Sequence, residues 1–450
     1  MSNSRRVFLR TLTAGTLSMG YSNMIYANSP QILVLGAGIA GLAAAQQLRA
    51  QGFKVTVLEA RNRIGGRIYT SRSWTGVPVD LGASWIHGDK NNPITKLADQ
   101  IKAHRIATSY DSAKLYIAPE LKKLGVTSTN ESKVANLVTK ALTQAEQQEQ
   151  DVSLRQAVDL VLPNPLPTSL KAQVDFYLNS KYEQEYSGSA RELSAHTMED
   201  NEEFDGADVL FPQGYDQIIS YLAQGLTIKT SQVIKKVEYT NQGVKVSTQN
   251  NTYTADYALV TLPLGVLKRN TVQFSPPLPA AKQQAIKRLG MGLLNKVFFR
   301  FDKVFWPKNI DWHEYLSPQA GRWVEWVSFA KTGAPILLGF NAADRARELE
   351  KWSDQAIIDD GMQVLREMFG NSIPQPVATQ ITRWAQDPYA YGSYSFNAVG
   401  STNQDRKALA STVAGRLLWA GEATSSLYPG TVHGAYLSGV EAAKRLKKPL

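Results

Sequence analysis

Three glycines spaced as Gly36, Gly38 and Gly41 could hold a phosphate, and Glu59, eighteen positions further on, could accept the hydroxyls of a ribose. Gly36 would permit a tight turn after a strand, Gly38 would let the backbone approach a pyrophosphate, and Gly41 would let a helix pack closely on a sheet. The free N–H groups and the positive dipole end of that helix favour an anion. A GxGxxG pattern alone is weak evidence, because such turns also occur by chance.

The flanking residues predict the elements that must position this turn. An apolar run at residues 32–35 predicts a strand, and the alanine-rich stretch after Gly38 predicts a helix. A second apolar run at residues 54–58 predicts another strand, which ends at Glu59. Strand, glycine turn with Ala37, helix, strand and acid form a βαβ unit, which is the context that a dinucleotide site requires. The stretch therefore predicts a dinucleotide-binding turn rather than an ordinary tight turn.

A second glycine doublet flanked by arginines follows at residues 59–67, EARNRIGGR. Backbone N–H groups and guanidinium groups here could complete the neutralisation of a pyrophosphate, which one helix terminus does only in part. A nicotinamide dinucleotide does not need this. The stretch resembles the flavoprotein family that includes amine oxidases, polyamine oxidases, amino-acid oxidases and phytoene desaturases, and the resemblance implies FAD. The residues that it adds to the cofactor site are Ala60, Arg61, Gly65, Gly66 and Arg67.

The sequence DLGASWIHG, residues 80–88, is similar to the segment that runs beside the flavin, and to polyamine oxidases in particular. On residue types alone it is a glycine-rich loop with a core tryptophan. The resemblance implies flavin contacts at Gly82, Ala83, Ser84 and Trp85, and a catalytic-site position for His87. Amino-acid oxidases carry an arginine near the place of Trp85 to hold the substrate carboxylate. Its absence favours an amine without a carboxylate.

Lys296 lies in an alternating segment, and this pattern alone predicts an edge lysine that faces solvent. The stretch GLLNKVFFRFDKVFWP, however, resembles the family closely at the lysine that hydrogen-bonds a water at flavin N5. That resemblance implies a catalytic role for Lys296. Apolar surroundings would lower the pKa of the lysine by desolvation, which suits proton handling.

The aromatic segment RWAQDPYAYGSY, residues 383–394, would be core on residue types alone. The resemblance implies that Trp384 lies beside the flavin and that Tyr394 forms one wall of an aromatic slot. Monoamine oxidases have a cysteine at the position of Ser393 that bonds the flavin, so serine in a chain without cysteine implies non-covalent FAD. The family often has a second slot tyrosine where this chain has Thr431, and Tyr436 or another aromatic residue could replace it.

Three further places complete the cofactor site that the resemblance implies. Val233 would meet the adenine through its backbone, and Gly421 with Glu422 would hold the ribityl or phosphate region. The helix that begins near Thr431 and Val432 would face the flavin pyrimidine, where its N-terminus stabilises negative charge on the reduced ring.

Composition sets further limits. The 450 residues allow two or three domains, and 43% hydrophobic with 20% charged residues is ordinary globular composition. The net charge of +10 is scattered, so no nucleic-acid site is predicted. Zero cysteines and five histidines without close spacing predict no metal site. Residues 198–208 carry six acids, which form either a solvated loop or a negative funnel for a cationic substrate.

Residues 1–27 resemble a twin-arginine signal peptide, with Arg5 and Arg6 before a modestly apolar stretch and a small-residue site at Ala27. A basic tail or a short anchor is the alternative, but the stretch is too short and polar to span a bilayer. We therefore expect no stable membrane insertion. We expect export of the folded protein by the twin-arginine machinery to the periplasm or beyond.

Together these patterns predict an α/β protein, α+β overall. A Rossmann-like FAD-binding domain (residues 30–90, 205–265 and 395–446) would interleave with a substrate domain of mixed sheet plus helices (residues 91–204 and 266–394). The implied activity is oxidation of an amine, most like a polyamine such as spermidine or spermine, to an imine that hydrolyses to aldehyde and amine, with O2 reduced to H2O2. Two alternatives remain open: a flavin dehydrogenase of another amine or alkaloid that uses a quinone or cytochrome, and a non-catalytic FAD-bound polyamine-binding protein.

Overall fold

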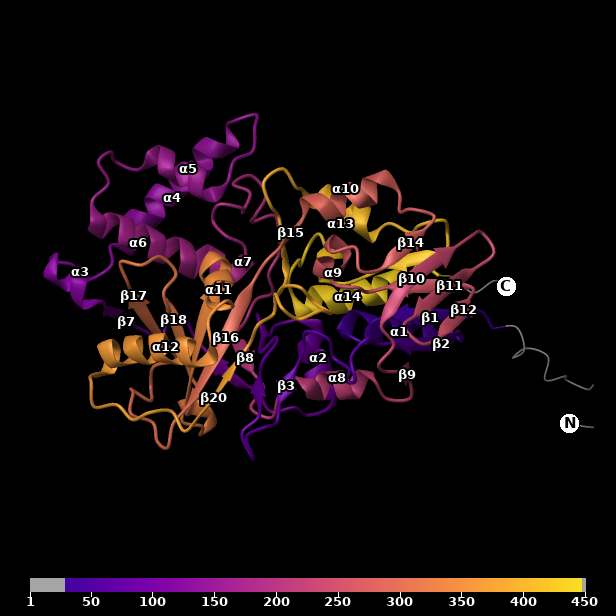
Figure 1. Ribbon diagram of the computed structural model, residues 1–450, viewed down its shortest axis with the longest axis horizontal. Coiled ribbons are helices and arrows are strands. Elements are labelled where there is room, and N and C mark those ends of the chain that lie inside the picture. Colours follow the sequence, from indigo (N-terminus) through magenta and orange to yellow (C-terminus); the bar gives the residue numbers. More distant parts are fainter. Residues whose placement is uncertain (1–28, 447–450) are drawn as a thin grey trace, which may run out of the picture.

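The computed structural model describes residues 29–446, whose elements gather in two halves (Figure 1). The parallel-sheet half is built on a five-stranded sheet in the order β22-β13-β1-β2-β9, with every neighbouring pair parallel. Its strands are β1 (Gln31–Leu35), β2 (Lys54–Leu58), β9 (Thr227–Lys229), β13 (Tyr257–Val260) and β22 (Leu417–Trp419). Strands from the beginning, middle and end of the chain thus form one sheet.

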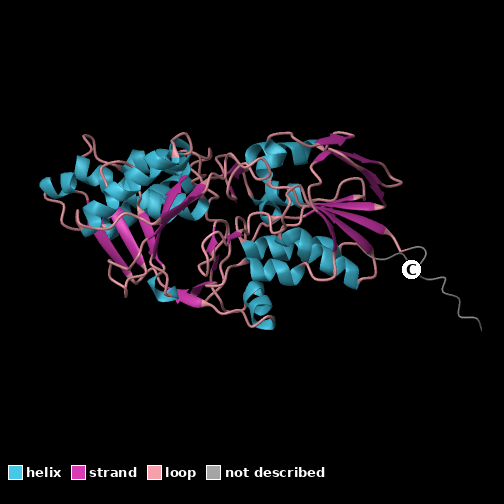
Figure 2. Cartoon of the chain, turned by 60° about the horizontal axis from the view of Figure 1, so that its bottom comes forward, coloured by secondary structure: helices cyan, strands magenta, loops and turns pink. Residues whose placement is uncertain are grey.

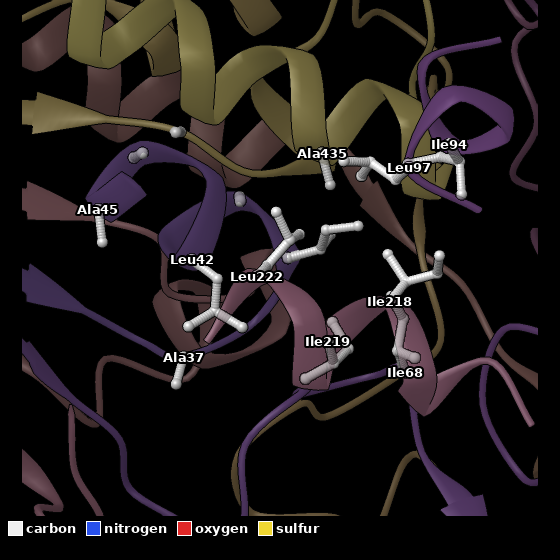
Figure 3. Packing of buried hydrophobic residues seen from close by; sticks show 14 of the residues in the cluster. Ala37, Leu42, Ala45, Ile68, Ile94, Leu97, Ile218, Ile219, Leu222 and Ala435 are labelled. Atoms are coloured by element: carbon white, nitrogen blue, oxygen red, sulfur yellow. The ribbon is translucent and has the colours of Figure 1, made fainter. Parts of the chain in front are cut away.

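Two helices from opposite ends of the chain pack together on this sheet: α1 (Ile39–Ala50) and α14 (Val432–Lys444). A β-carbon on Gly439 would lie 2.1 Å from the Ala40 carbonyl oxygen, so the two backbones are in close contact. Apolar residues of α1, α2 (Pro93–Gln100), α8 (Asp216–Leu222) and α14 form the core around them (Figure 3). The predicted strand, glycine turn, helix and strand are all present.

A second sheet of the same half has the order β12-β11-β10-β14. The break at residues 241–243 turns β10 into β11 as an antiparallel hairpin. The bounds of these strands and of the helices beside them are β10 (Ile234–Tyr239), β11 (Val244–Thr248), β12 (Thr252–Ala255), β14 (Gln273–Ser275), α9 (Leu264–Lys268), α10 (Ala280–Arg288) and α13 (Asn403–Ala410).

The mixed-sheet half holds a six-stranded sheet in the order β20-β16-β19-β18-β17-β7, and helices cover it (Figures 1 and 2). Its strands are β7 (Ala113–Ile117), β16 (Leu294–Arg300), β17 (Trp312–Leu316), β18 (Glu325–Ser328), β19 (Ile336–Ala342) and β20 (Ala378–Ile381). Its helices are α3 (Pro119–Lys123), α4 (Glu131–Glu146), α5 (Leu154–Val161), α6 (Thr168–Leu178), the π-helical turn η1 (Asn179–Glu183), α7 (Gln184–Tyr186), the 3₁₀ turn η2 (Ala330–Thr332), α11 (Ala343–Leu349) and α12 (Asp354–Phe369).

Short elements join the two halves. They are β3 (Thr70–Ser71), β4 (Val79–Asp80), β5 (Trp85–Ile86), β6 (Ile106–Thr108), β8 (Asp208–Leu210), β15 (Gly290–Met291), β21 (Ser395–Phe396) and the 3₁₀ turn η3 (Glu422–Thr424). The strands β5, β8 and β6 form one small sheet.

One prediction from pattern alone is wrong. Lys296 does not face solvent from an edge, because β16 lies between β20 and β19 and the residue is only 6% exposed. The segment after Pro93 contains strands as well as helices, and β7 pairs with β17 along its whole length. The α/β fold class is confirmed. Among residues 29–446, no helix is both long and apolar enough to cross a membrane.

Candidate active site

A cavity of about 860 Å³ is lined by residues of both halves. It brings together all the predicted catalytic residues and all but two of the predicted cofactor residues. These are Gly36, Gly38, Glu59, Ala60, Arg61, Gly65, Gly66, Arg67, Gly82, Ala83, Ser84, Trp85, His87, Val233, Lys296, Trp384, Tyr394, Gly421, Glu422, Thr431 and Val432. Residues more than three hundred positions apart in the sequence therefore line the same cavity.

The two exceptions, Ala37 and Gly41, support the cavity from behind. The Ala37 N–H donates to Glu59 Oε2 across 2.8 Å and so fixes the carboxylate. A β-carbon on Gly41 would lie 2.0 Å from the Gly36 carbonyl oxygen, so this glycine permits the helix to start against the turn. Gly36 itself has φ +118°, which favours glycine.

The glycine turn leaves donors free at one end of the cavity. Helix α1 has no side-chain cap at its N-cap Gly38, so its first N–H groups are available to an anion. A β-carbon on Gly38 would meet no heavy atom within 4 Å, which leaves room for a ligand to approach the backbone. The Glu59 carboxylate accepts from the N–H groups of Ala37 and Arg61, each across 2.8 Å, and each oxygen keeps a free lone pair.

Both predicted arginines beside this turn are held by carboxylates. Arg61 forms a two-pronged ion pair with Asp387 at 2.7 and 2.8 Å. Arg67 donates to Glu422 across 2.9 Å and to the Ser393 carbonyl oxygen across 2.8 Å. Burial alone would raise the pKa of Glu422, but the Arg67 charge and other partners lower it below its usual range. Glu422 is therefore an anion that orients Arg67 rather than a free acceptor.

Lys296 connects the two halves. Its Nζ donates to the carbonyl oxygens of Asp80 and Gly82 across 3.0 and 2.5 Å, and to Ser84 Oγ across 2.5 Å. All three ammonium protons are used, and the nitrogen lies 5.6 Å from the centre of the Trp85 ring. Burial lowers the pKa of Lys296, and the nearby Asp80 carboxylate partly opposes this. Burial likewise raises the pKa of Asp80.

The two aromatic residues predicted for the site, Trp384 and Tyr394, both line the cavity. Trp384 is buried and donates to the Leu81 carbonyl oxygen across 3.2 Å, while the Tyr394 hydroxyl donates to the Gln184 carbonyl oxygen across 2.6 Å. Thr431 caps α14 by accepting from the Gly434 N–H. Tyr436 packs against the core beside α1, and Tyr428, in the loop before α14, lines the cavity.

His87 lies at the acidic side of the cavity, where its Nδ1 is 3.2 Å from Asp208 Oδ2. Enclosure by the cavity walls alone would lower the pKa of His87, but the hydrogen bond and charge of Asp208 raise it by more. Of the acidic segment, Glu202, Glu203 and Asp208 line the cavity, and Glu185 joins them from α7. A cation entering here meets carboxylates.

Several cavity residues carry no motif that sequence reasoning could use. Those with polar side chains include Tyr110, Ser180, Glu185, Glu325, Arg406 and His433. The one sequence signal is Glu325, a lone acid inside the apolar run WVEWVSF. The others come from separate helices and loops, and only the fold brings them together.

The residues present fit FAD, in which phosphates are joined to a flat apolar ring. Uncapped N–H groups, the open face of Gly38 and the Glu59 carboxylate suit the adenosine and pyrophosphate. Three buried nitrogens of cavity-lining residues, Trp312 Nε1, Arg406 Nη2 and His433 Nε2, have no hydrogen-bond partner among the described residues. Since buried donors of this kind are rare, they indicate that the cavity accepts polar ligand atoms.

Comparison with known proteins agrees with this geometry. Residues 39–447 match the family of flavin containing amine oxidoreductases. The chain is 35% identical over 439 residues to Polyamine oxidase 2 of Arabidopsis thaliana, covering 92% of this chain and 88% of that protein. It is 36% identical over 440 residues to Polyamine oxidase 4 of Oryza sativa subsp. japonica, covering 94% and 89%.

A third relative is much longer than this chain. Lysine-specific histone demethylase 1 homolog 1 of Oryza sativa subsp. japonica is 34% identical over 451 residues, which cover 93% of this chain but 52% of that protein. The common part therefore spans nearly all of this chain. The protein belongs to the flavin containing amine oxidoreductase family and is an FAD-dependent amine oxidase.

Proposed function

We propose that the protein oxidises a polyamine such as spermidine or spermine, that the resulting imine hydrolyses to an aldehyde and a smaller amine, and that O2 is reduced to H2O2. One observation carries this proposal. A single cavity joins the glycine turn of a dinucleotide site to a chamber with aromatic walls, and Lys296 lies on its wall. The relatives named polyamine oxidases support the substrate class.

The charges of the chamber suit a substrate with several ammonium groups. Glu185, Glu202, Glu203 and Asp208 face the cavity, and clustered carboxylates in a cleft raise the local concentration of cations. Aromatic rings of Trp85, Trp312 and Phe340 lie next to one another with centroids 6.0 to 6.2 Å apart. Such rings hold alkyl chains by contact and cations by their π faces.

The chemistry that bound FAD would supply is acceptance of a hydride equivalent from the carbon beside the amine nitrogen and transfer of the electrons to O2. The chain supplies position and proton handling. Lys296 fixes the loop of Gly82 and Ser84 and is a buried titratable group that lines the cavity. Trp384 and Tyr394 form part of the chamber wall. A free alkylamine has a pKa of about 10.4, so the reacting nitrogen must lose a proton, and oxidation should speed up as the pH rises.

Anaerobic mixing of the holoenzyme with spermidine tests the proposal. We expect the oxidised flavin absorbance to bleach, and H2O2 to form in proportion to product when air is admitted. Bleaching without peroxide, with electrons delivered to a quinone dye, would identify a dehydrogenase instead. Binding without bleaching, by spermidine or any other amine, would identify a non-catalytic binding protein. Neither outcome is compatible with the proposal.

We also propose that the protein is exported folded to the periplasm or beyond. The support is the Arg5-Arg6 pair and the apolar stretch that follows it, which lie outside the described residues. Replacing both arginines by lysine should leave active, full-length protein in the cytoplasm. Export that is unchanged in this variant would refute the twin-arginine route.

A further inference from the structure

Four side chains form a row across the mixed sheet. Lys296 of β16 pairs with Phe340 of β19, and Glu325 of β18 pairs with Glu314 of β17. Strands β18 and β19 are antiparallel, and Trp326 pairs with Gly339. One position further along this register, Glu325 lies opposite Phe340. Paired residues share one face of a sheet, so Lys296 and Glu325 face the same way, roughly 10 Å apart at about 4.8 Å per strand.

Glu325 is an enclosed carboxyl group with one protein partner. It is 5% exposed, yet it lines the cavity. The Ser180 hydroxyl donates to its Oε1 across 2.5 Å, while none of the described residues donates to its Oε2. Ser180 lies in the π-helical turn η1, a local irregularity of the kind that is frequent at functional sites. A carboxylate buried with a single neutral donor lacks the compensation that such groups usually have.

The wall between Lys296 and Glu325 is aromatic. Phe340 separates the two residues in the row, and its ring lies 6.1 Å from Trp85 and 6.2 Å from Trp312. Tyr110 stacks on Trp312 with the ring centres 4.2 Å apart. An alkyl chain that runs along this wall would have one end beside Lys296 and the other beside Glu325.

We infer that Glu325, oriented by Ser180, is the binding site for the distal ammonium group of the substrate. The inference rests on the proposed function and narrows it. A molecule with a second cationic nitrogen, separated from the reacting one by a short alkyl chain, is preferred over a monoamine of the same length.

The ionisation of Glu325 agrees with this role. Burial raises the pKa of Glu325 to about 8, and the neighbouring Glu314 raises it further while the Ser180 hydrogen bond and Lys181 lower it. The carboxyl group without ligand is thus largely protonated at neutral pH. An ammonium group that binds here favours the carboxylate, so binding releases a proton.

Two probes of equal length separate the ammonium site from the rest of the chamber: N-butyl-1,3-diaminopropane, and dibutylamine, in which a methyl replaces the terminal amine. Binding to the FAD-loaded enzyme, whose flavin is first reduced so that neither amine is oxidised, is measured anaerobically by the shift in melting temperature. Glu325→Gln keeps the shape and removes the charge. Glu314→Gln is the matched control, since it removes a carboxyl from the same row outside the cavity lining.

We expect Glu325→Gln to weaken the diamine by about 10- to 100-fold and dibutylamine by less than about twofold, because charge-assisted hydrogen bonds are lost for the diamine only. Glu314→Gln should weaken neither probe, because Glu314 does not line the cavity and its removal lowers the pKa of Glu325 toward the ionised form. Equal weakening of both probes by Glu325→Gln, or no weakening of the diamine, would overturn the inference.

A measurement on the wild-type enzyme gives an independent test that needs no variant. At about pH 7, the diamine should release close to one proton more per molecule bound than dibutylamine does. Equal release would also overturn the inference. Failure of the proposed function looks different: spermidine then leaves the wild-type flavin oxidised, whatever the two probes show in binding.

Discussion

The Lys296 ammonium group donates to the Gly82 carbonyl oxygen across 2.5 Å, so a strand of the mixed sheet fixes a loop that lines the predicted flavin site. The same nitrogen holds Ser84 and the Asp80 backbone. One residue thus combines a structural and a chemical role, and a mutation will affect both. A variant of a second buried lysine, one outside the cavity, serves to separate the kinetic effect of such a mutation from its structural effect.

Lys296→Met should slow H2O2 production by roughly 100-fold, because a positioned proton-transfer group is lost. Burial lowers the pKa of Lys296 below the ordinary lysine range, so the rate of flavin reoxidation in the wild type should depend on pH in that lower range. This pH dependence should disappear in Lys296→Met. Stopped-flow reoxidation across pH measures both. Lys282→Met is the control: Lys282 is buried against the Ala408 and Leu409 carbonyl oxygens, away from the cavity. An unchanged reoxidation rate in Lys296→Met would contradict the assignment.

Gly38→Ala should keep the fold and lose the cofactor. Its φ of −75° suits alanine and the new β-carbon meets no protein atom within 4 Å, so the melting temperature without FAD should not fall. Affinity for FAD should fall at least about tenfold, since the methyl group occupies the approach to the helix N-terminus. Gly41→Ala should instead destabilise the protein without FAD, because its β-carbon would lie 2.0 Å from the Gly36 oxygen. FAD titration and thermal melts measure both; normal FAD affinity in Gly38→Ala would refute the placement.

Glu422→Gln should lower the free energy of unfolding at neutral pH by roughly 3–5 kcal/mol, because Arg67 loses a buried partner. The folded-state pKa of Glu422 lies below the usual 4.5, so its stabilisation is present above that value and is lost as the pH falls through the folded pKa. Urea unfolding at about pH 7 and pH 4 should show a flatter dependence in the variant. Glu238→Gln, at an exposed ion pair with Lys236, should change little. An equal effect of both variants would count against this role.

His87→Gln should flatten the pH dependence of KM for a diamine. Enclosure of the imidazole ring alone would lower the pKa of His87, but the hydrogen bond and the charge of Asp208 raise this pKa above 6.5. As the pH rises through it, the ring loses its charge, the acidic side becomes more negative, and KM should fall by about three- to fivefold. The variant should lack this step and already show the lower KM on its acidic side. His104→Gln, exposed outside the cavity, should behave like the wild type. The same step of about three- to fivefold in His87→Gln as in the wild type would refute the explanation.

Features that spacing and periodicity encode directly can be predicted from the sequence. The glycine turn, α1 and β2 agree with the sequence expectation for this reason. The position of Lys296 cannot be predicted from pattern alone, because alternation does not say which strand lies at an edge. The family resemblance predicts that Lys296 belongs to the site, and the cavity lining agrees.

Residues that act through distant partners cannot be predicted in this way. Glu325 stands alone in an apolar strand, and its meaning depends on the register of β18 with β19 and on Ser180, 145 positions earlier. The sequence of the acidic segment, residues 198–208, fits a solvated loop and a negative funnel equally well, because the direction of its carboxylates also depends on distant partners. Its carboxylates face the cavity only because β8 pairs with β5, next to His87.

The order of strands in the parallel sheet also determines when the site can exist. β1 begins at Gln31 and β22 ends at Trp419, and β13 lies between them in the sheet. A nascent chain on the ribosome therefore carries the glycine turn long before it has the strand and the helix that complete its surroundings. Cofactor capture must follow synthesis of nearly the whole polypeptide. Bound FAD thereby distinguishes finished molecules from truncated ones.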